Sequence, residues 1–261
     1  MSDNKPSFIQ LPHSLDNAVE NLTDKPTKSV GATLSDIWFL VFGGISHTAE
    51  KKRLEYAADL EKFRLDLEEK TSRIPDEKKI DPSIQVTAQA IDDSKYCVQD
   101  SSLRSMFVSL ISNSMNSDYA SEVHPSFSGM IKQMSCLDGK LLWIFKNGPS
   151  EGLPLCDYRK ENVDGSFESL VENVFLDMPG YDIHSISRSI TSLERFGLLT
   201  IPPFIELAPE EGTNNVYQKF ENAPLYHELQ ANYSGSKITI CHRKVNLTPL
   251  GRSFVKVCIP D

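Results

Sequence analysis

Residues 100–145 read DSSLRSMFVSLISNSMNSDYASEVHPSFSGMIKQMSCLDGKLLWIF, and this stretch decides the fold class of the chain. It contains three helical segments, each with one apolar stripe at a spacing of three and four residues. Asp100 or Ser101 is expected to cap the first segment, and a His-Pro pair begins the second. Ser135-x-x-Asp138 resembles a capping box for the third. The middle of the chain is therefore predicted to be a compact all-helical bundle.

Toward the N-terminus, a long charged helix is expected over Glu50–Arg73. Its apolar residues form a narrow seam at spacings of four and three: Tyr56, Leu60, Phe63 and Leu67. One interpretation is a solvated helix that packs this stripe on the protein body. The other is a short coiled-coil seam, although the repeat lasts barely two heptads. A shorter helix is expected after Asp81-Pro82, with Ile84 on its buried face.

Residues 31–45, GATLSDIWFLVFGGI, form the most apolar run in the chain. Its apolar residues fall at helical spacing, so Trp38 and Phe42 are candidate interaction residues. Three interpretations are open: a buried or partner-binding helix, an interfacial membrane helix, or a transmembrane hairpin. The run is shorter than the about 20 residues that a bilayer-spanning helix needs. Residues 1–30 are polar, and a flexible arm without the apolar core of a secretory signal is expected there.

The composition is that of an ordinary soluble globular protein, with 39% hydrophobic and 24% charged residues among 261. The formal net charge of -9 argues against a main task of binding a phosphate backbone. The cysteines form no CxxC pair and no zinc-spaced cluster, so reduced thiols are expected. Phosphate-loop, dinucleotide-binding and HExxH motifs are absent from the sequence, and neither a cofactor nor a metal is expected.

His124 is the one residue of the 100–145 stretch that could carry chemistry. It lies just before a predicted helix N-terminus, where the helix dipole lowers the pKa of an imidazole and favours anion binding. No GxSxG motif or reactive-cysteine context supplies a nucleophile. His124 is therefore a candidate interaction residue, and capping or packing at the turn is the simpler interpretation.

Residues 150–165 are rich in glycine, proline and charge, and they are predicted to be a linker. A helix is expected over residues 167–175, because apolar residues recur there at helical spacing after Ser166. A second helix is expected from Asp182, its cap, to Phe196, where Gly197 follows.

The remainder of the chain predicts a strand and a last helix. Residues 237–241 alternate like a strand, and Thr248-Pro249 begins a helix over LGRSFVKVC. The succession of helix, LERFGLLT and short strand, together with the ending LTPLGRSF, resembles winged-helix proteins. A winged-helix-like domain is therefore predicted over residues 166–261, after a helical domain over residues 31–149.

In this winged helix, the presumed recognition helix exposes Arg188 and Arg195, which could contact phosphates or a guanine edge. Residues 150–261, however, contain ten Lys and Arg against fifteen Asp and Glu. Winged helices also serve as protein-interaction modules, and a fold does not determine its function. Protein contact is therefore the preferred interpretation, and nucleic-acid binding is the alternative.

Several short motifs in the first half are similar to the abortive-infection alpha (Abi-alpha) family of bacterial proteins. They include Ile74-Pro75, Pro82, Tyr96, LRSMF, LISNSM, HPSF, IKQMS and Leu137-Asp138. The resemblance covers residues 51–145 best, and its motifs are structural. It implies a bacterial or phage-encoded protein linked to antiviral defence, and it transfers no functional residue to this chain.

The sequence thus predicts a mainly α protein, with an N-terminal helical bundle followed by a C-terminal winged-helix-like α+β module. The expected function is non-enzymatic, linked to phage defence, and exerted through contacts with a protein partner or a second copy of the chain. A DNA-binding regulator and a membrane-associated toxic effector that uses residues 31–45 are the alternatives. A cytoplasmic location is expected, with membrane association left open.

Overall fold

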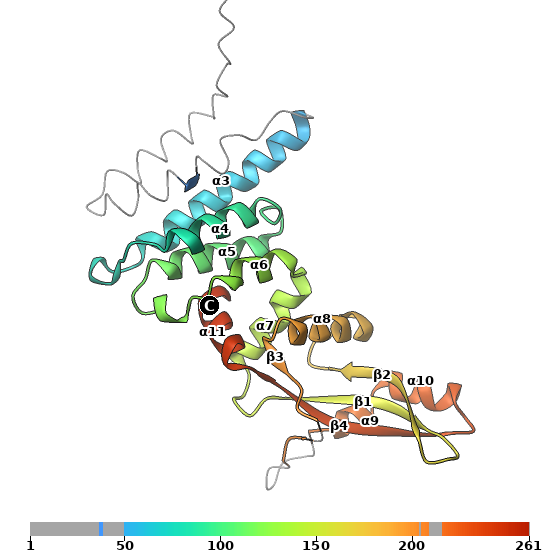
Figure 1. The fold of residues 1–261 in the computed structure, drawn as a ribbon. Coiled ribbons are helices and arrows are strands. Elements are labelled where there is room, and N and C mark those ends of the chain that lie inside the picture. The colour runs from blue at the N-terminus through green and yellow to red at the C-terminus, as the bar shows by residue number, and fades with distance from the viewer. Residues whose placement is uncertain (1–36, 39–49, 204, 209–215, 261) are drawn as a thin grey trace, which may run out of the picture. The chain divides into compact units, whose positions relative to one another are not determined.

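The computed structural model describes residues 37–38, 50–203, 205–208 and 216–260. The chain divides into two compact units (Figure 1). The first unit comprises residues 1–134 and 256–261, and the second comprises residues 135–255. The predicted arm over residues 1–30 lies outside the described residues, as does the apolar run 31–45 except for Ile37 and Trp38. The predicted linker at 150–165 falls inside the second unit.

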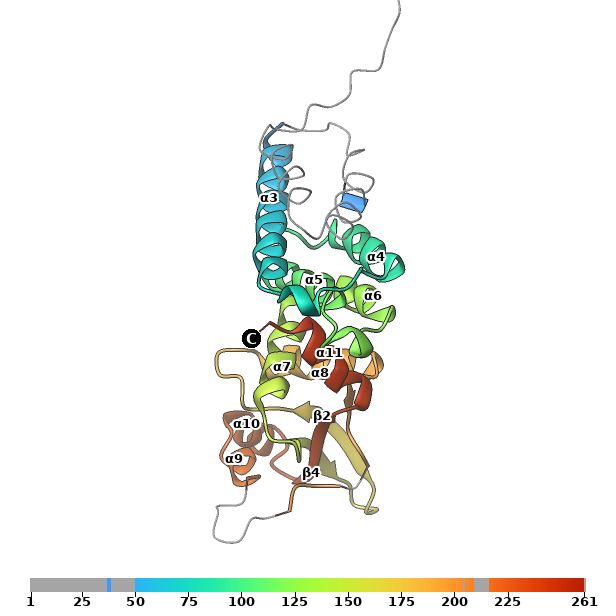
Figure 2. The ribbon, with the colours of Figure 1, turned by 90° about the vertical axis from the view of Figure 1, so that its left-hand side faces the viewer.

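The described helices of the first unit form a bundle around α5 (Figure 2). Their bounds are α3 (Glu50–Ser72), α4 (Ile84–Ser94), α5 (Ser101–Ser114) and α6 (Ser126–Gln133), with 3-10 turns η1 (Asp76–Lys78) and η2 (Ala120–Glu122). α5 contacts the other three helices, and Phe107, Leu110 and Ile111 on it are fully buried. The predicted helices of this part are confirmed, but the third helix expected in the 100–145 stretch belongs to the second unit, which begins at Ser135.

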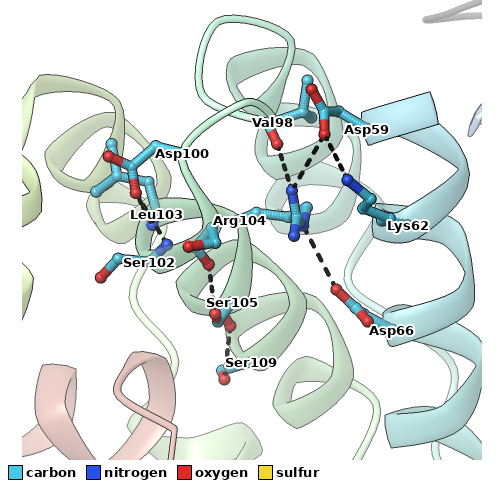
Figure 3. Close-up of polar contacts among 11 residues, drawn as sticks. Asp59, Lys62, Asp66, Val98, Asp100, Ser102, Leu103, Arg104, Ser105 and Ser109 are labelled. Atoms are coloured by element: carbon cyan, nitrogen blue, oxygen red, sulfur yellow. Dashed lines mark hydrogen bonds and ion pairs between the residues drawn. The ribbon is translucent and has the colours of Figure 1, made fainter. Parts of the chain in front are cut away.

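Polar contacts fix the start of α5 (Figure 3). The side chain of Asp100 accepts hydrogen bonds from the backbone N–H groups of Ser102 and Leu103, at 2.9 and 3.1 Å. This is the predicted cap, and it satisfies two donors that a helix leaves unpaired. Arg104 ties α5 to α3, because its guanidinium lies 3.4 Å from the carboxylate of Asp66.

The predicted start of α4 is wrong by two residues. α4 begins at Ile84 with Ser83 in the capping position. Ile84, which was expected on the buried face, is 66% exposed, whereas Ile91, which was expected there too, is buried. Val86 is also buried. Ile84 is the first residue of α4.

The second unit combines five helices of the described residues with a four-stranded antiparallel sheet of order β2-β1-β4-β3. Its elements are α7 (Cys136–Asn147), β1 (Leu153–Glu161), β2 (Phe167–Val174), α8 (Ile183–Arg195), β3 (Leu199–Thr200), α9 (Gln218–Glu221), α10 (Pro224–Asn232), β4 (Lys237–Leu247) and α11 (Pro249–Cys258), whose last residues belong to the first unit. A mainly α chain with a β component is confirmed. The winged-helix assignment of α8, β3, β4 and α11 stays a prediction.

The predicted linker is wrong at the level of secondary structure, because residues 153–161 form β1. This strand pairs with β2 on one side and β4 on the other, so it lies inside the sheet. The charges that indicated a linker form ion pairs across the strands. Lys160 lies 2.5 Å from Glu168, and Glu161 lies 2.9 Å from Lys237. Opposite charges on neighbouring strands stabilise a sheet, so a charged segment can still be a strand.

The predicted helix over residues 167–175 is also wrong, because residues 167–174 form β2. A β-bulge explains the misleading spacing. Val174 pairs with Cys156 and Val171 pairs with Tyr158, so three residues of β2 span two residues of β1. The extra residue changes the interval between inward-facing side chains from two to three. Apolar residues then recur as they would on a helix.

Other predictions for the second unit are confirmed. Asp182 caps α8 and accepts a hydrogen bond from the Ser185 N–H at 2.8 Å. The capping box at the start of α7, between Ser135 and Asp138, is present. The predicted strand at 237–241 is the first part of β4, which continues to Leu247. Thr248 accepts a hydrogen bond from the Gly251 N–H, as expected of a residue that begins α11.

Candidate functional site

The sheet of the second unit has two different faces. Side chains alternate between the faces along a strand. Cys156 and Tyr158 of β1 belong to a buried apolar cluster with Tyr217 and Phe220, and this cluster packs against residues of α10. Asp157 and Arg159, which alternate with them, therefore lie on the opposite face.

This opposite face also carries residues of β4. In the register of β1 and β4, Cys241 pairs with Asp157, and Arg243 pairs with Leu155. Cys241 and Arg243 therefore share the face of Asp157, and each is half-buried. On this side of the sheet Leu155 and Asp157 are buried, whereas Arg159, Cys241 and Arg243 are partly exposed, and we call it the open face.

Asp157 is the centre of a polar cluster on the open face. Its side chain is only 1% exposed, whereas those of Arg159 and Arg243 are 34% and 22% exposed. The Arg159 Nη2 atom donates to Asp157 Oδ2 at 2.8 Å, and the Arg243 Nη1 atom donates to the same oxygen at 3.1 Å. A buried carboxylate thus holds two guanidinium groups beside each other at the surface.

Asn173 completes this cluster from the bulge of β2. Its backbone N–H donates to Asp157 Oδ1 at 3.0 Å, and its side-chain Nδ2 donates to Thr191 Oγ1 on α8 at 3.2 Å. Asn173 has a φ of 52°, and it is the one positive-φ residue besides glycine in the described part of the chain. Bulges and left-handed residues re-aim backbone groups, and here they aim an N–H at the carboxylate. Asp157, Arg159, Asn173, Thr191 and Arg243 form what we call the Asp157 cluster.

The electrostatics of the Asp157 cluster favour an anionic ligand. Two guanidinium groups hydrogen-bond one carboxylate, so their positive charge exceeds that of Asp157 by one, and the charge of Glu172, which also acts on Arg159, reduces this excess. Burial lowers the pKa of Arg159, but the hydrogen bond and charge of Asp157, with other nearby acidic groups, outweigh it and raise the pKa. Arginine forks match the geometry of carboxylate and phosphate oxygens. The cluster can therefore bind an oxyanion at the open face.

Of the two candidate residues from the apolar run 31–45, the structure describes Trp38 but not Phe42. Trp38 is buried, and its ring centroid lies 5.3 Å from that of Phe63 on α3. Ile37 beside it is buried as well. Phe42 lies outside the described residues. Packing of Trp38 on the first unit agrees with the buried-helix interpretation at this position.

His124 is exposed, and its contacts are local. Its Nδ1 atom lies 2.7 Å from Ser126 Oγ and 3.2 Å from the Ser126 backbone N, at the first residue of α6. Its ring centroid lies 5.9 Å from that of the buried Phe127. These contacts are those of a residue that caps and packs at a turn.

Arg188 and Arg195 lie exposed on α8. Arg188 donates to Ser185 Oγ at 2.9 Å, and the Arg195 guanidinium lies over the Phe196 ring at 4.6 Å. Thr191, between them in sequence, contacts Asn173 of the Asp157 cluster. The structure thus places α8 beside the candidate site, although neither arginine belongs to the cluster itself.

Sequence reasoning missed the Asp157 cluster. A signal was present in β1, where Asp157 and Arg159 alternate with Cys156 and Tyr158. Such alternation is typical of a strand with one polar face. The glycine and proline residues on either side concealed it, because they indicated a linker.

Two other buried carboxylates join helices. Asp93 of α4 accepts hydrogen bonds from Ser128 Oγ at 2.5 Å and Lys132 Nζ at 2.8 Å, both on α6. Asp138 of α7 accepts from Ser189 Oγ on α8. No group of three or more His, Cys, Asp or Glu side chains within the described ranges could hold a metal ion. Nor does any helix in those ranges have the length and apolarity to cross a membrane.

The chain also matches a known protein family over most of its length. The family model described as abortive infection alpha matches residues 55–258. This range includes residues 55–134 of the first unit and every residue of the Asp157 cluster. No curated protein and no solved structure gives a significant match. Because the family match spans far more than half of the sequence, the chain belongs to the abortive infection alpha family.

Proposed function

We propose that this chain is a non-enzymatic component of abortive infection that acts by binding a partner protein at the open face of its second unit. The Asp157 cluster supports this proposal, because it holds two arginines ready at a surface. Arginine is among the residues that contribute most to protein interfaces. Family membership supports the link to abortive infection.

The contacts of Asp157 favour binding over catalysis. Its carboxylate already accepts hydrogen bonds from the Asn173 N–H and from both arginines. A general base needs a free oxygen within reach of a substrate proton. Arginine stays protonated in proteins and transfers no proton. The cluster therefore fixes the positions of two positive charges, and none of its groups is suited to transfer a proton.

A DNA-binding regulator is the second candidate, because Arg188 and Arg195 are exposed on α8 beside the cluster. The excess of acidic residues in the C-terminal half disfavours it. Retention on duplex DNA that weakens as salt rises would support this candidate. Absence of a mobility shift at low salt would remove it.

A membrane-acting effector that uses residues 31–45 is the third candidate. Burial of Trp38 against Phe63 disfavours it, because a residue that packs on α3 is not available to lipid. Liposome flotation of the intact chain, compared with a version that lacks residues 1–49, would decide between them. Flotation of the intact chain alone would support this candidate.

The direct test of the proposed function is induced expression in bacteria, with growth, membrane potential and phage plating followed together. The test variant is Arg159→Gln/Arg243→Gln. Lys237→Gln is the matched control, because Lys237 is an exposed cation on the strand of Arg243 and forms an ion pair with Glu161. We expect the double variant to lose phage restriction and the control to keep it. Full restriction by the double variant, at equal protein level, would overturn the proposal.

A further inference from the structure

We infer that the occupant of the open face is an acidic segment of a partner protein, one carboxylate of which lies between the guanidinium groups of Arg159 and Arg243. This inference rests on the proposed function and adds the chemistry of the partner. It follows from the free edges of the two arginines and from the charge of the cluster.

Arg159 and Arg243 each have guanidinium N–H groups that do not take part in the hydrogen bonds to Asp157. A guanidinium has five N–H groups. Arg159 donates to Asp157 through Nη2 alone, and Arg243 donates through Nη1 alone. Within the described part of the chain, the remaining nitrogen atoms of these two groups make no hydrogen bond. Each fork therefore keeps a free edge at a half-exposed position.

Asp157 holds these free edges in place. Because Arg159 and Arg243 donate to the same oxygen, their guanidinium groups converge from β1 and β4. Both are anchored in a sheet by a side chain that is only 1% exposed. A fork that is already ordered loses less conformational entropy when it binds a ligand. The arrangement is thus suited to a planar oxyanion that accepts two parallel hydrogen bonds.

The charge of the cluster distinguishes a carboxylate from a phosphate. The two arginines exceed Asp157 by one positive charge, and the charge of Glu172, which also acts on Arg159, reduces this excess. A carboxylate carries one negative charge, whereas a phosphate group carries between one and a half and two at neutral pH. A phosphate would therefore leave more negative charge uncompensated beside Asp157 and Glu172.

The test is an NMR titration of the full chain that follows the side-chain Nε–Hε signals of Arg159 and Arg243. The probes are N-acetyl-tetraglutamate amide, the matching tetraglutamine peptide and inorganic phosphate. We expect the glutamate peptide to shift both signals saturably, and the other two probes to have much smaller effects. Arg159→Gln should weaken the response at Arg243 by about tenfold, the effect of losing one strong interface arginine. Arg195→Gln is the matched control and should leave the response unchanged.

Three results would overturn the inference: no saturable shift, equal shifts at Arg188 and Arg195, or tighter binding of phosphate than of the glutamate peptide. The wild-type titration alone decides the matter if Arg159→Gln does not fold. A shift by the glutamate peptide with full phage restriction by Arg159→Gln/Arg243→Gln would refute the proposed function and leave the ligand chemistry standing. Lost restriction without a peptide shift would refute the ligand chemistry alone.

Discussion

At the scale of single residues, the second unit depends on a left-handed asparagine and a buried carboxylate that meet at one hydrogen bond. Asn173 adopts a φ of 52° so that its N–H can reach Asp157. Asparagine tolerates this conformation better than most residues, because its short polar side chain bonds locally. The side-chain bond to Thr191 then links the bulge to α8.

The strain at Asn173 can be measured with two substitutions. Asn173→Ala and Asn173→Gly both remove the amide, but only alanine has a Cβ atom that opposes positive φ. We expect Asn173→Ala to have a free energy of unfolding about 1 kcal/mol lower than Asn173→Gly. Equilibrium unfolding in urea measures the difference. Equal stability of the two variants would contradict the role of the backbone conformation.

The contribution of the buried Asp157 carboxylate to the free energy of unfolding can be compared with that of the exposed Glu168 carboxylate. Asp157→Asn leaves two guanidinium groups without their counter-charge, and we expect the free energy of unfolding to fall by about 2–4 kcal/mol. Glu168→Gln, which breaks the exposed ion pair with Lys160, is the matched control on the neighbouring strand. We expect it to change stability by less than about 1 kcal/mol. Urea unfolding gives both values, and similar effects for the two substitutions would count against a buried anchor.

At the scale of secondary-structure elements, two glycines in helices show how packing determines the effect of one methyl group. A Cβ atom on Gly251 of α11 would lie 2.0 Å from the carbonyl oxygen of Leu198. A Cβ atom on Gly129 of α6 would meet nothing within 4 Å. The approach of α11 to the chain before β3 therefore requires glycine, whereas α6 does not.

Alanine at these two positions should have opposite effects. Gly251→Ala forces backbone apart, and we expect it to lower the free energy of unfolding by at least about 2 kcal/mol. Gly129→Ala should raise it by about 0.5–1 kcal/mol, because alanine is the better helix former. Thermal or urea unfolding of both variants decides the matter. A neutral Gly251→Ala would show that α11 does not pack closely on Leu198.

The helices were more predictable than the sheet, and capping explains why. Asp100, Ser135 and Asp182 each begin a helix as their local sequence indicates, since a cap is formed by residues close together in the chain. Strand β2 depends instead on a bulge that only its partner β1 defines. Helical spacing over residues 167–175 therefore predicted the wrong element. The strands were harder to predict than the helices because they depend on pairing between distant parts of the chain, which no local pattern encodes.

The candidate site was unpredictable for the same reason. Arg243 lies 86 positions from Asp157 in the chain, and the register of two strands brings them together. Asn173 joins them only because the bulge turns its N–H toward the carboxylate. Arg188 and Arg195 were selected because they lie on a predicted helix surface, and that helix indeed contacts the cluster through Thr191.

At the scale of the whole molecule, the two tryptophans of the chain belong to different units and differ in burial. Trp38 is buried in the first unit, whereas Trp143 of the second unit is 51% exposed. We expect Trp38→Ala to lower the free energy of unfolding by about 3 kcal/mol, as loss of a buried aromatic ring does. Trp143→Ala should change it by less than about 1 kcal/mol. Urea unfolding followed by circular dichroism measures both, and a neutral Trp38→Ala would contradict its packing on α3.

The overall charge of the chain also favours a selective surface. The formal net charge of -9 keeps non-specific association with nucleic acid weak. Arg159 and Arg243 form a local concentration of positive charge on this acidic chain. The buried Asp157 carboxylate, beside the bulge of β2, fixes their positions. In the proposed function, Arg159 and Arg243 are the residues through which the protein acts in abortive infection.

Phage plating on cells that express Arg159→Lys/Arg243→Lys tests this claim most directly. Lysine keeps both positive charges but has no planar fork for a carboxylate. We predict that the lysine pair loses phage restriction as fully as Arg159→Gln/Arg243→Gln, at equal protein level and with Lys237→Gln unaffected. Restriction by the lysine pair at the level of the unchanged protein would contradict the claim, because charge alone would then suffice.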